Sequence, residues 1–142
     1  MKISLEQANR IIEGALQRAV DAGYKPMAVA VAVLDESGQL ISLQRQDGAT
    51  AFRIDIATGK AWASVSMGAS SRVLLQKAQA MPAFFDALAV TGQGTFIPQT
   101  GAVLIKDDTG KVLGAVGASG GTGDENEEIC MAGVEAAGLS AS

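Results

Sequence analysis

Two pairs of short apolar segments, each joined by an acidic turn that ends in glycine, constrain the fold of this chain most strongly. The first pair covers residues 27–34 and 39–44, and the second covers residues 102–105 and 111–118. Strands joined by such short turns form antiparallel hairpins. Hairpins favour an antiparallel sheet with helices packed against it, so we expect an α+β fold and not a doubly wound one.

Helical periodicity accounts for most of the remaining chain. Ser4 is suited to cap a helix that ends at Gly23 and whose apolar face carries Leu5, Ala8, Ile12, Ala15, Leu16 and Val20. Further helices are expected over residues 51–66 and 71–80, one or two turns over 82–88, and a last helix from Asp124 to Gly138. The order is therefore helix, hairpin, helices, hairpin, helix.

The strand over residues 27–34 alternates alanine with valine. Successive side chains of a strand point to opposite faces, so one face of this strand is small and the other is branched. The small face lets a helix lie close to the sheet, and because both faces are apolar the strand should be central.

Length and charge narrow the classes of protein. A chain of 142 residues is the usual size of one domain, so residues 1–142 are expected to form a single domain. The net charge is −4, with lysine and arginine scattered singly, which disfavours nucleic acid and anionic membrane as partners. No apolar leader is present, and no segment reaches the roughly 18 apolar residues of a membrane span, so a cytoplasmic protein is expected.

Histidine is absent and Cys130 is the only cysteine. These two facts exclude a Ser-His or Cys-His nucleophile pair, an imidazole ligand for haem iron and a thiolate cluster for zinc, and we expect no metal site. Cys130 is expected to be a small buried hydrophobe, and Met67, Met81 and Met131 are expected to fill the core.

The glycine loop at residues 119–123 leads from the last strand into an acidic helix start. Such loops cradle phosphates in many proteins. Here no Gly-Lys-Ser/Thr ends the loop, and Asn126 stands where a dinucleotide-binding motif has glycine. The carboxylates of residues 124–128 would also repel a phosphate, so nucleotide binding is disfavoured.

A set of segments that covers nearly the whole chain resembles the GlcG/HbpS-like family, the haem-binding and haem-degrading domain also found at the C-terminus of PduO-type proteins. The segments that carry the resemblance are residues 29–35 with Gly38, residues 45–49, Lys60 with Ala61, residues 114–121, and Ala132 with Gly133. Each is unspecific alone, but the set occurs in the same order and with similar spacing. The chain departs from the family at Asn126, where relatives often carry aspartate, and at residues 99–101, where many have paired glycines.

The resemblance implies a five-stranded antiparallel sheet flanked by helices, in subunits that form homo-oligomers. It also implies a small-molecule ligand, and haem is the one cofactor that it suggests. Family members differ in function, so the resemblance leaves open whether this chain is catalytic.

Two glycine turns and two cations are the candidate ligand-binding residues. Both turns lie where a strand exits toward a helix, and we expect an antiparallel sheet to bring them to one rim, where their amides could bind a carboxylate or propionate. The structural alternative is that they are turns that need positive φ. Arg53 and Lys60 are seven residues apart on one helical face and could hold an anion, or Lys60 could extend to solvent. The candidates are Asp47, Gly48, Ala49, Arg53, Lys60, Ser119, Gly120 and Gly121.

Two functions follow as alternatives. The first is a binding protein whose pocket near the glycine turns holds, and could degrade, haem or a small carboxylate. The second is an enzyme of small organic-acid or aromatic-acid catabolism, in which Lys60 and Asp47 are the polar groups nearest the reacting centre. The absence of histidine weighs against iron ligation and against acid–base catalysis alike.

Overall fold

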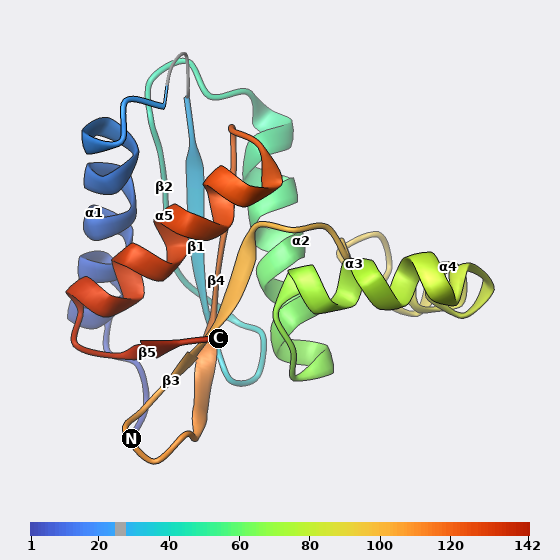
Figure 1. Ribbon diagram of the computed structural model, residues 1–142. Coiled ribbons are helices and arrows are strands. Elements are labelled where there is room, and N and C mark those ends of the chain that lie inside the picture. The colour runs from blue at the N-terminus through green and yellow to red at the C-terminus, as the bar shows by residue number, and fades with distance from the viewer. Residues whose placement is uncertain (25–27) are drawn as a thin grey trace.

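The computed structural model describes residues 1–24 and 28–142, and its centre is an antiparallel sheet of five strands in the order β2-β1-β4-β3-β5 (Figure 1). The strands are β1 (Ala30–Asp35), β2 (Leu40–Arg45), β3 (Ala102–Lys106), β4 (Val112–Ser119) and β5 (Ser140–Ala141). The helices are α1 (Leu5–Asp21), α2 (Ala51–Met67), α3 (Ser71–Ala80), α4 (Pro82–Thr91) and α5 (Gly123–Ala136). The α+β class expected from the hairpins is confirmed.

Both hairpins form as predicted, β1 with β2 and β3 with β4. Their turns contain Gly38 at φ +80 and Gly110 at φ +85, a conformation that glycine adopts without strain. The first strand was expected over residues 27–34, but its pairing begins at Ala30, and Met27 lies outside the described residues. The two hairpins join where β1 pairs with β4, which brings Ala30 opposite Ser119.

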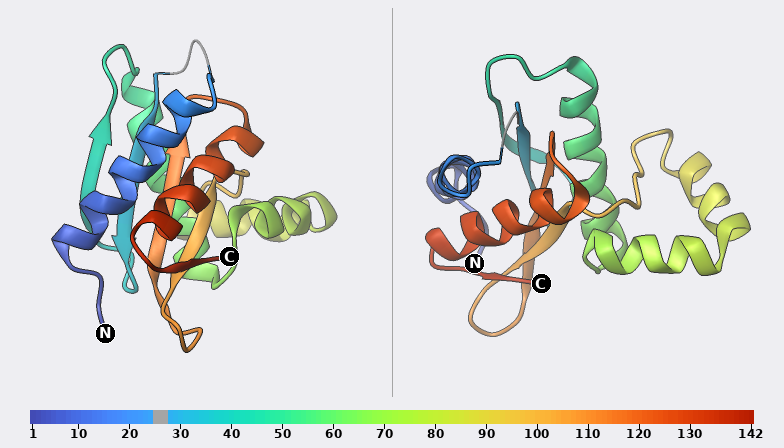
Figure 2. Two further views of the ribbon diagram at one scale, coloured as in Figure 1. Left: turned by 60° about the vertical axis from the view of Figure 1, so that its left-hand side comes forward. Right: turned by 45° about the horizontal axis from the view of Figure 1, so that its top comes forward.

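The two faces of β1 pack against different helices, as its alternation predicts. Val29, Val31 and Val33 face the core shared with α1 and α5, whereas Ala30 and Ala32 pack against Ala57 of α2. Figure 2 shows α1 and α5 together on one side of the sheet and α2 on the other. The molecule is therefore a three-layer arrangement in which α2 lies on the small-residue face.

Glycine sets how closely these layers approach. A Cβ atom added to Gly117 of β4 would lie 2.3 Å from the Ala57 carbonyl oxygen of α2, and one added to Gly133 of α5 would lie 2.2 Å from the Ile11 carbonyl oxygen of α1. Real Cβ atoms do not approach carbonyl oxygens this closely. Both helices lie directly against backbone, which fixes their positions relative to the sheet.

Several finer expectations are wrong. Ser4 caps α1 with a capping box as expected, but Leu5 and Val20 are about three-fifths exposed, and the buried face includes Ile11 and Ala19 instead. Met67, Met81 and Met131 are also partly exposed and do not fill the core. Cys130, in contrast, is fully buried as expected.

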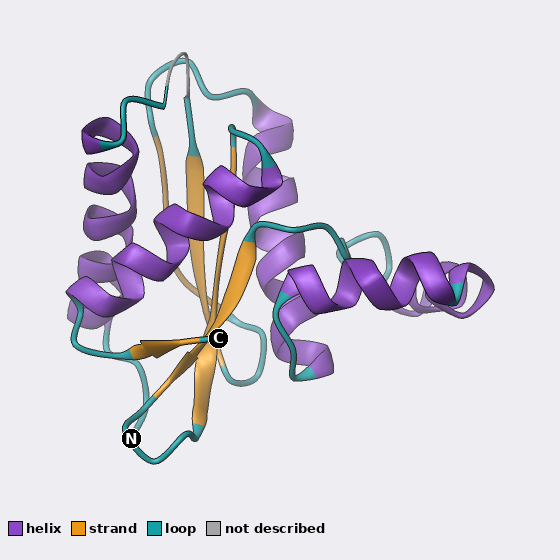
Figure 3. Cartoon of the chain, in the orientation of Figure 1, coloured by secondary structure: helices purple, strands orange, loops and turns teal. Residues whose placement is uncertain are grey.

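The segment after α2 differs most from the sequence expectation. Instead of one or two turns, α4 is a helix of ten residues whose only buried residue is Phe85. In Figures 1 and 3, α3 and α4 extend away from the sheet as a helical pair. Phe84 and Val90 of α4 are 53% and 79% exposed, so this pair, termed the arm, presents apolar side chains to solvent. Within the described ranges, no helix is both long enough and apolar enough to span a membrane.

Candidate functional site

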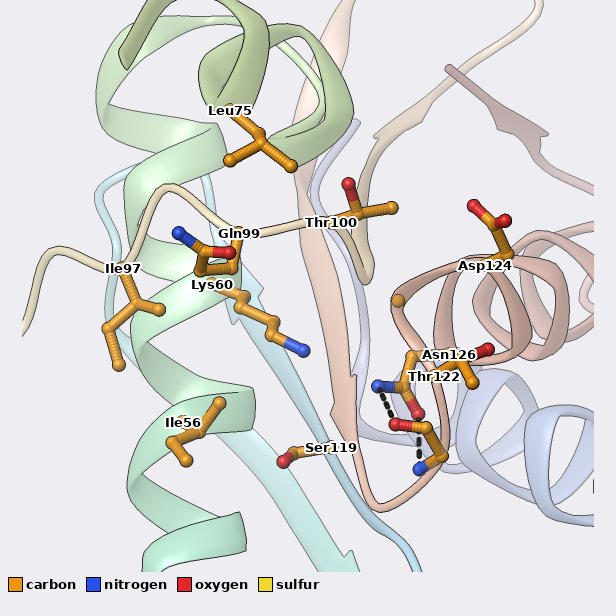
Figure 4. Close-up of a pocket in the computed structure, with 12 residues that line it drawn as sticks. Ile56, Lys60, Leu75, Ile97, Gln99, Thr100, Ser119, Thr122, Asp124 and Asn126 are labelled. Carbon is orange, nitrogen blue, oxygen red and sulfur yellow. Dashed lines mark hydrogen bonds between the residues drawn. The ribbon is translucent and has the colours of Figure 1, made fainter. Parts of the chain in front are cut away.

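A pocket of about 570 Å³ lies between α2, the start of α5, α3 and the loop before β3. Its volume falls within the range of about 300–1,000 Å³ that is usual for small-molecule sites. Figure 4 shows the Lys60 side chain extending from α2 into the space between these elements. The lining residues are Ile56, Lys60, Leu75, Ile97, Gln99, Thr100, Ser119, Gly121, Thr122, Gly123, Asp124 and Asn126.

Lys60 is the cation of this pocket and is buried to an unusual degree. The residue is 6% exposed, and its Nζ atom donates a hydrogen bond to the carbonyl oxygen of Ala118 at 3.2 Å. Burial lowers the pKa of Lys60 below its usual value of 10.5. Lysine is almost never buried without a charged partner, so this side chain calls for a functional explanation.

Gly101 makes room for the Lys60 amine. A Cβ atom at Gly101 would lie 2.8 Å from Lys60 Nζ and 3.1 Å from Asn126 Cβ, and the residue has φ +137. Any side chain at this position would displace the amine or the amide. The sequence contains Gly101 directly before β3, but nothing local distinguishes it from a turn glycine.

Asn126 organises the glycine loop beside the pocket. It is 2% exposed; its Oδ1 accepts a hydrogen bond from the Gly121 N–H at 3.0 Å, and its Nδ2 donates one to the Gly121 carbonyl oxygen at 3.3 Å. The next amide, that of Thr122, donates to Glu125 in the capping box of α5. The N–H groups of Gly121 and Thr122 therefore already donate hydrogen bonds within the protein and are not free to bind an anion. This favours the interpretation that the loop is a turn that needs positive φ.

An ion-pair cluster joins the arm to α5 at the edge of the pocket. Arg72 of α3 contacts Asp124 and lies 3.1 Å, through Nε, from Glu127 Oε2. Asp124 lines the pocket, but Arg72 neutralises its charge, so the carboxylate does not dominate the electrostatics there. Exposed pairs of this kind contribute little stability, and their main effect is to position α3 relative to α5.

The predicted site residues fall into two groups. Lys60, Ser119 and Gly121 line the pocket. Gly120, which precedes Gly121, has φ +149 and packs against Ala28. The other group, Asp47, Gly48, Ala49 and Arg53, is not among the lining residues of this pocket.

The second group nevertheless lies at the same edge of the sheet. Arg53 donates to the Ala28 carbonyl oxygen, and a Cβ atom at Gly48 would lie 3.8 Å from Ala28 Cβ. The two glycine turns therefore both approach Ala28, but Arg53 and Lys60 bind carbonyl groups of different segments and do not form a joint anion site.

Most of the remaining pocket residues were not predicted. Ile56 precedes Lys60 by one helical turn, and this spacing could have placed it on the same face. Leu75, Ile97, Gln99 and Thr100 come from α3 and an irregular loop, where periodicity gives no orientation. Asn126 was considered as a departure from the family pattern and from the dinucleotide-binding motif, and not as a pocket residue.

A second pocket of about 420 Å³ adjoins the first, because Ile56 and Ile97 line both. Its outer wall includes Phe52, which is 76% exposed, together with Asp55 and Gln93. The two pockets together form a groove along α2. Lys60 lies in the first pocket, and the apolar side chains of Ile56 and Ile97 lie where the two pockets meet.

No group of histidine, cysteine, aspartate and glutamate residues that could hold a metal ion occurs among residues 1–24 and 28–142. The sequence contains no histidine, and no methionine or cysteine lines the Lys60 pocket in the part of the chain that the structure describes. The donors that face the pocket are an amine, hydroxyls and carboxamides, which suit an anionic organic molecule better than a metal.

These features define an α+β protein with a small-molecule pocket built around one buried lysine. The chain belongs to the family described as haem degrading protein HbpS-like, whose sequence pattern matches residues 3–135. The resemblance stated from the sequence is confirmed.

Solved structures show the same fold. The crystal structure of a PduOC–haem complex is 23% identical, with a TM-score of 0.86 over 99% of this chain and 98% of that one. The Klebsiella pneumoniae protein ORFY is 24% identical, with a TM-score of 0.85 over 97% and 92% of the two chains. A double mutant of Streptomyces reticuli HbpS is 25% identical, with a TM-score of 0.79 over 95% and 86%. No curated protein sequence matches significantly.

Proposed function

We propose that this protein binds a carboxylate-bearing molecule in the Lys60 pocket, either haem through its propionates or a small organic acid. The observation that carries the proposal is that a 6%-exposed lysine, held by one backbone carbonyl group, faces an open pocket of about 570 Å³. A buried cation without a counter-ion is costly, and a ligand carboxylate would remove that cost.

Haem is supported by family membership and by the PduOC–haem complex, which has the same fold. The pocket residues fit the two ends of such a molecule: Lys60 and Ser119 could bind a propionate, and Ile56, Leu75 and Ile97 provide apolar contact. Among the described residues that line the pocket, the side-chain amine that could bind iron through nitrogen is Lys60 in its neutral form, because the sequence has no histidine. When bound, haem would supply iron redox chemistry, and this chain would supply the binding and orientation.

A small organic acid is supported by the hydroxyls and carboxamides that surround Lys60. Ser119, Thr100 and Gln99 all line the pocket and can donate hydrogen bonds to carboxylate oxygens. The enzymatic alternative loses one of its two proposed groups, since Asp47 is not among the residues that line this pocket. We therefore favour binding over catalysis by Lys60 with Asp47.

The same proposal includes a cytoplasmic homo-oligomer of single-domain subunits. The exposure of two apolar side chains of the arm, Phe84 and Val90, is the observation that favours association. Light scattering at micromolar concentration tests this point, and a monomer would contradict it.

Parallel titrations of the purified protein distinguish the two ligand sources. Haemin binding is followed by its Soret band, and binding of succinate, glycolate and pyruvate by the melting temperature. A ligand present at a hundred times its Kd stabilises the folded state by about 2.7 kcal/mol. We expect at least one ligand to bind to the natural protein and to Lys77→Met, an exposed control on α3, but not to Lys60→Met.

The outcomes separate cleanly. A saturable Soret change that Lys60→Met abolishes identifies haem, and stabilisation by an acid alone identifies a small carboxylate. If neither haemin nor any acid binds, or if Lys60→Met binds as well as the natural protein, the proposal is wrong.

A further inference from the structure

We propose that Lys60 forms a reversible Schiff base with a small 2-oxo acid, so that the pocket holds its ligand covalently through the buried amine. This inference deepens the proposed function and depends on the binding of a carboxylate at the same pocket. It names the class of small acid and the atom to which that acid becomes attached.

The first support is the surroundings of the amine. Nζ has one hydrogen-bond partner in the described structure, the neutral Ala118 carbonyl oxygen at 3.2 Å. Lys60 takes part in none of the ion pairs formed by residues 1–24 and 28–142. An amine that is buried without a counter-charge loses its proton more readily than a surface amine, and the neutral amine is the nucleophile.

The second support is space with suitable donors beside the amine. Figure 4 shows the Lys60 side chain ending between Thr100 and Ser119. Both residues are largely buried, at 9% and 7% exposed, and neither hydroxyl has a hydrogen-bond partner among the described residues. These hydroxyls can donate to the carbonyl oxygen of a ligand and polarise it toward attack.

The third support is that no unpaired carboxylate among the described residues that line the pocket competes with the ligand carboxylate for Lys60. The one carboxylate that lines the pocket, that of Asp124, is paired with Arg72 and is 81% exposed. A second anion brought by the ligand is therefore not repelled from the inner part of the pocket, where Lys60 is the only cationic side chain among the lining residues.

The chemistry balances without an oxidant or reductant. The lone pair of the neutral Nζ forms a bond to C2 of the acid while the carbonyl π electrons move to the oxygen, and the positively charged nitrogen then passes one proton to that oxygen through water. The resulting neutral carbinolamine takes a second proton from water in the open pocket, which leaves hydroxide in the solvent, and its oxygen departs as water while the nitrogen lone pair forms the C=N bond. The product is an iminium ion, whose positive charge lies next to the ligand carboxylate.

Reductive trapping tests the inference on the full chain. The protein is incubated with pyruvate and sodium borohydride, and the adduct is located by peptide mass spectrometry. Acetate, which lacks the carbonyl group, and acetone, which lacks the carboxylate, serve as matched probes. We expect a pyruvate adduct on Lys60, less adduct with acetone and none with acetate.

Variants and unfolding provide the controls. The adduct is expected to disappear in Lys60→Met, to remain in Lys77→Met, and to lose its preference for Lys60 when the protein is unfolded in urea before trapping. An adduct shared equally with exposed lysines, or its absence in the natural protein, overturns the inference.

The melting temperature separates this failure from failure of the proposed function. Stabilisation by pyruvate without a trapped adduct disproves the Schiff base and leaves carboxylate binding intact. If pyruvate neither stabilises the protein nor forms an adduct, while haemin binds, the pocket takes its carboxylate from haem and the inference is wrong. If no ligand binds, both proposals fail.

Discussion

The Nζ atom of Lys60 lies 3.2 Å from the carbonyl oxygen of Ala118, at the end of the central strand β4. An ammonium group has three N–H donors, and this contact satisfies one of them. Among residues 1–24 and 28–142, no second hydrogen-bond partner and no ion-pair partner of this amine is found. The fold therefore keeps a buried amine whose removal from water costs free energy of folding.

Replacing Lys60 with methionine should stabilise the unliganded protein. Methionine has a similar shape and no charge to desolvate, so we expect a gain of about 0.5–2 kcal/mol in the free energy of unfolding at pH 7. Urea denaturation measures it. A loss of stability would mean that the lysine contributes to the fold itself.

The same variant has a signature in pH. Because the folded state lowers the pKa of Lys60 below 10.5, the unfolded chain binds this proton more tightly, and unfolding takes up a proton in the interval between the two pKa values. The cost of Lys60 burial is therefore full below that interval and disappears above pH 10.5. We expect the advantage of Lys60→Met to shrink as the pH rises toward 10.5, and a pH-independent difference would contradict this origin.

Asn126→Asp should have two effects: it should loosen the glycine loop at residues 119–123, and it should add a negative charge beside the pocket. An aspartate can still accept a hydrogen bond from the Gly121 N–H, but it cannot donate one to the Gly121 carbonyl oxygen, as Asn126 Nδ2 does. It would also supply a carboxylate near Lys60, which should compete with an anionic ligand. We expect weaker acid binding than in the natural protein, measured by calorimetry. Asn126→Ala, which loses the loop contacts but adds no charge, should retain more affinity than Asn126→Asp.

Gly117→Ala should reduce both stability and ligand binding. The added Cβ would lie 2.3 Å from the Ala57 carbonyl oxygen, so α2 must move away from β4, and Lys60 moves with it. Overpacking of this kind costs about 1–3 kcal/mol. The control is Gly23→Ala, whose added Cβ meets no atom of residues 1–24 and 28–142 within 4 Å but whose φ is +70. It should cost stability through backbone strain alone and leave the affinity unchanged; equal loss of affinity in both variants would refute the link between α2 packing and the site.

Cys130 should make the protein sensitive to alkali. Burial raises the pKa of its thiol from 9.0 to about 12, so between these values the unfolded chain loses a proton that the folded chain keeps. Stability falls with pH in that window, by up to about 1.4 kcal/mol per pH unit from this group. Relative to Cys130→Ala, the natural protein should lose stability from pH 9 upward. Parallel curves for the two proteins would show that the thiol stays protonated in both states.

The sequence was sufficient for the architecture because its signals are local. Ser4, Gly38 and Gly110 act within a few residues, and the alanine–valine alternation of β1 assigns its two faces without tertiary information. The full length of α4 and the two-residue β5 were not indicated by the residues, since α4 has a nearly continuous apolar sequence and β5 is too short to show alternation. The fifth strand was expected only from the family resemblance.

The site was predicted in part for the same reason. Lys60 and Ser119 follow from helix and strand positions, but Asn126 and Gly101 act through contacts between segments that are distant in sequence. The interpretation of Asp47 and Arg53 as partners of Lys60 relied on their sharing one rim. Arg53 instead donates to the Ala28 carbonyl oxygen, and Asp47 is not among the residues that line the Lys60 pocket.

The inner and outer walls of the pocket differ in how freely they can be substituted. The inner wall is formed by the backbone of β4 and by α2, which packs against Gly117, so substitution there disturbs the core. The outer wall is formed by Leu75 of the arm and by Ile97 and Gln99 of the loop before β3. Ligand preference can therefore be redesigned by exchanging side chains on that outer wall while the lysine and its scaffold stay untouched. A library confined to these three positions would be an economical way to retarget the protein.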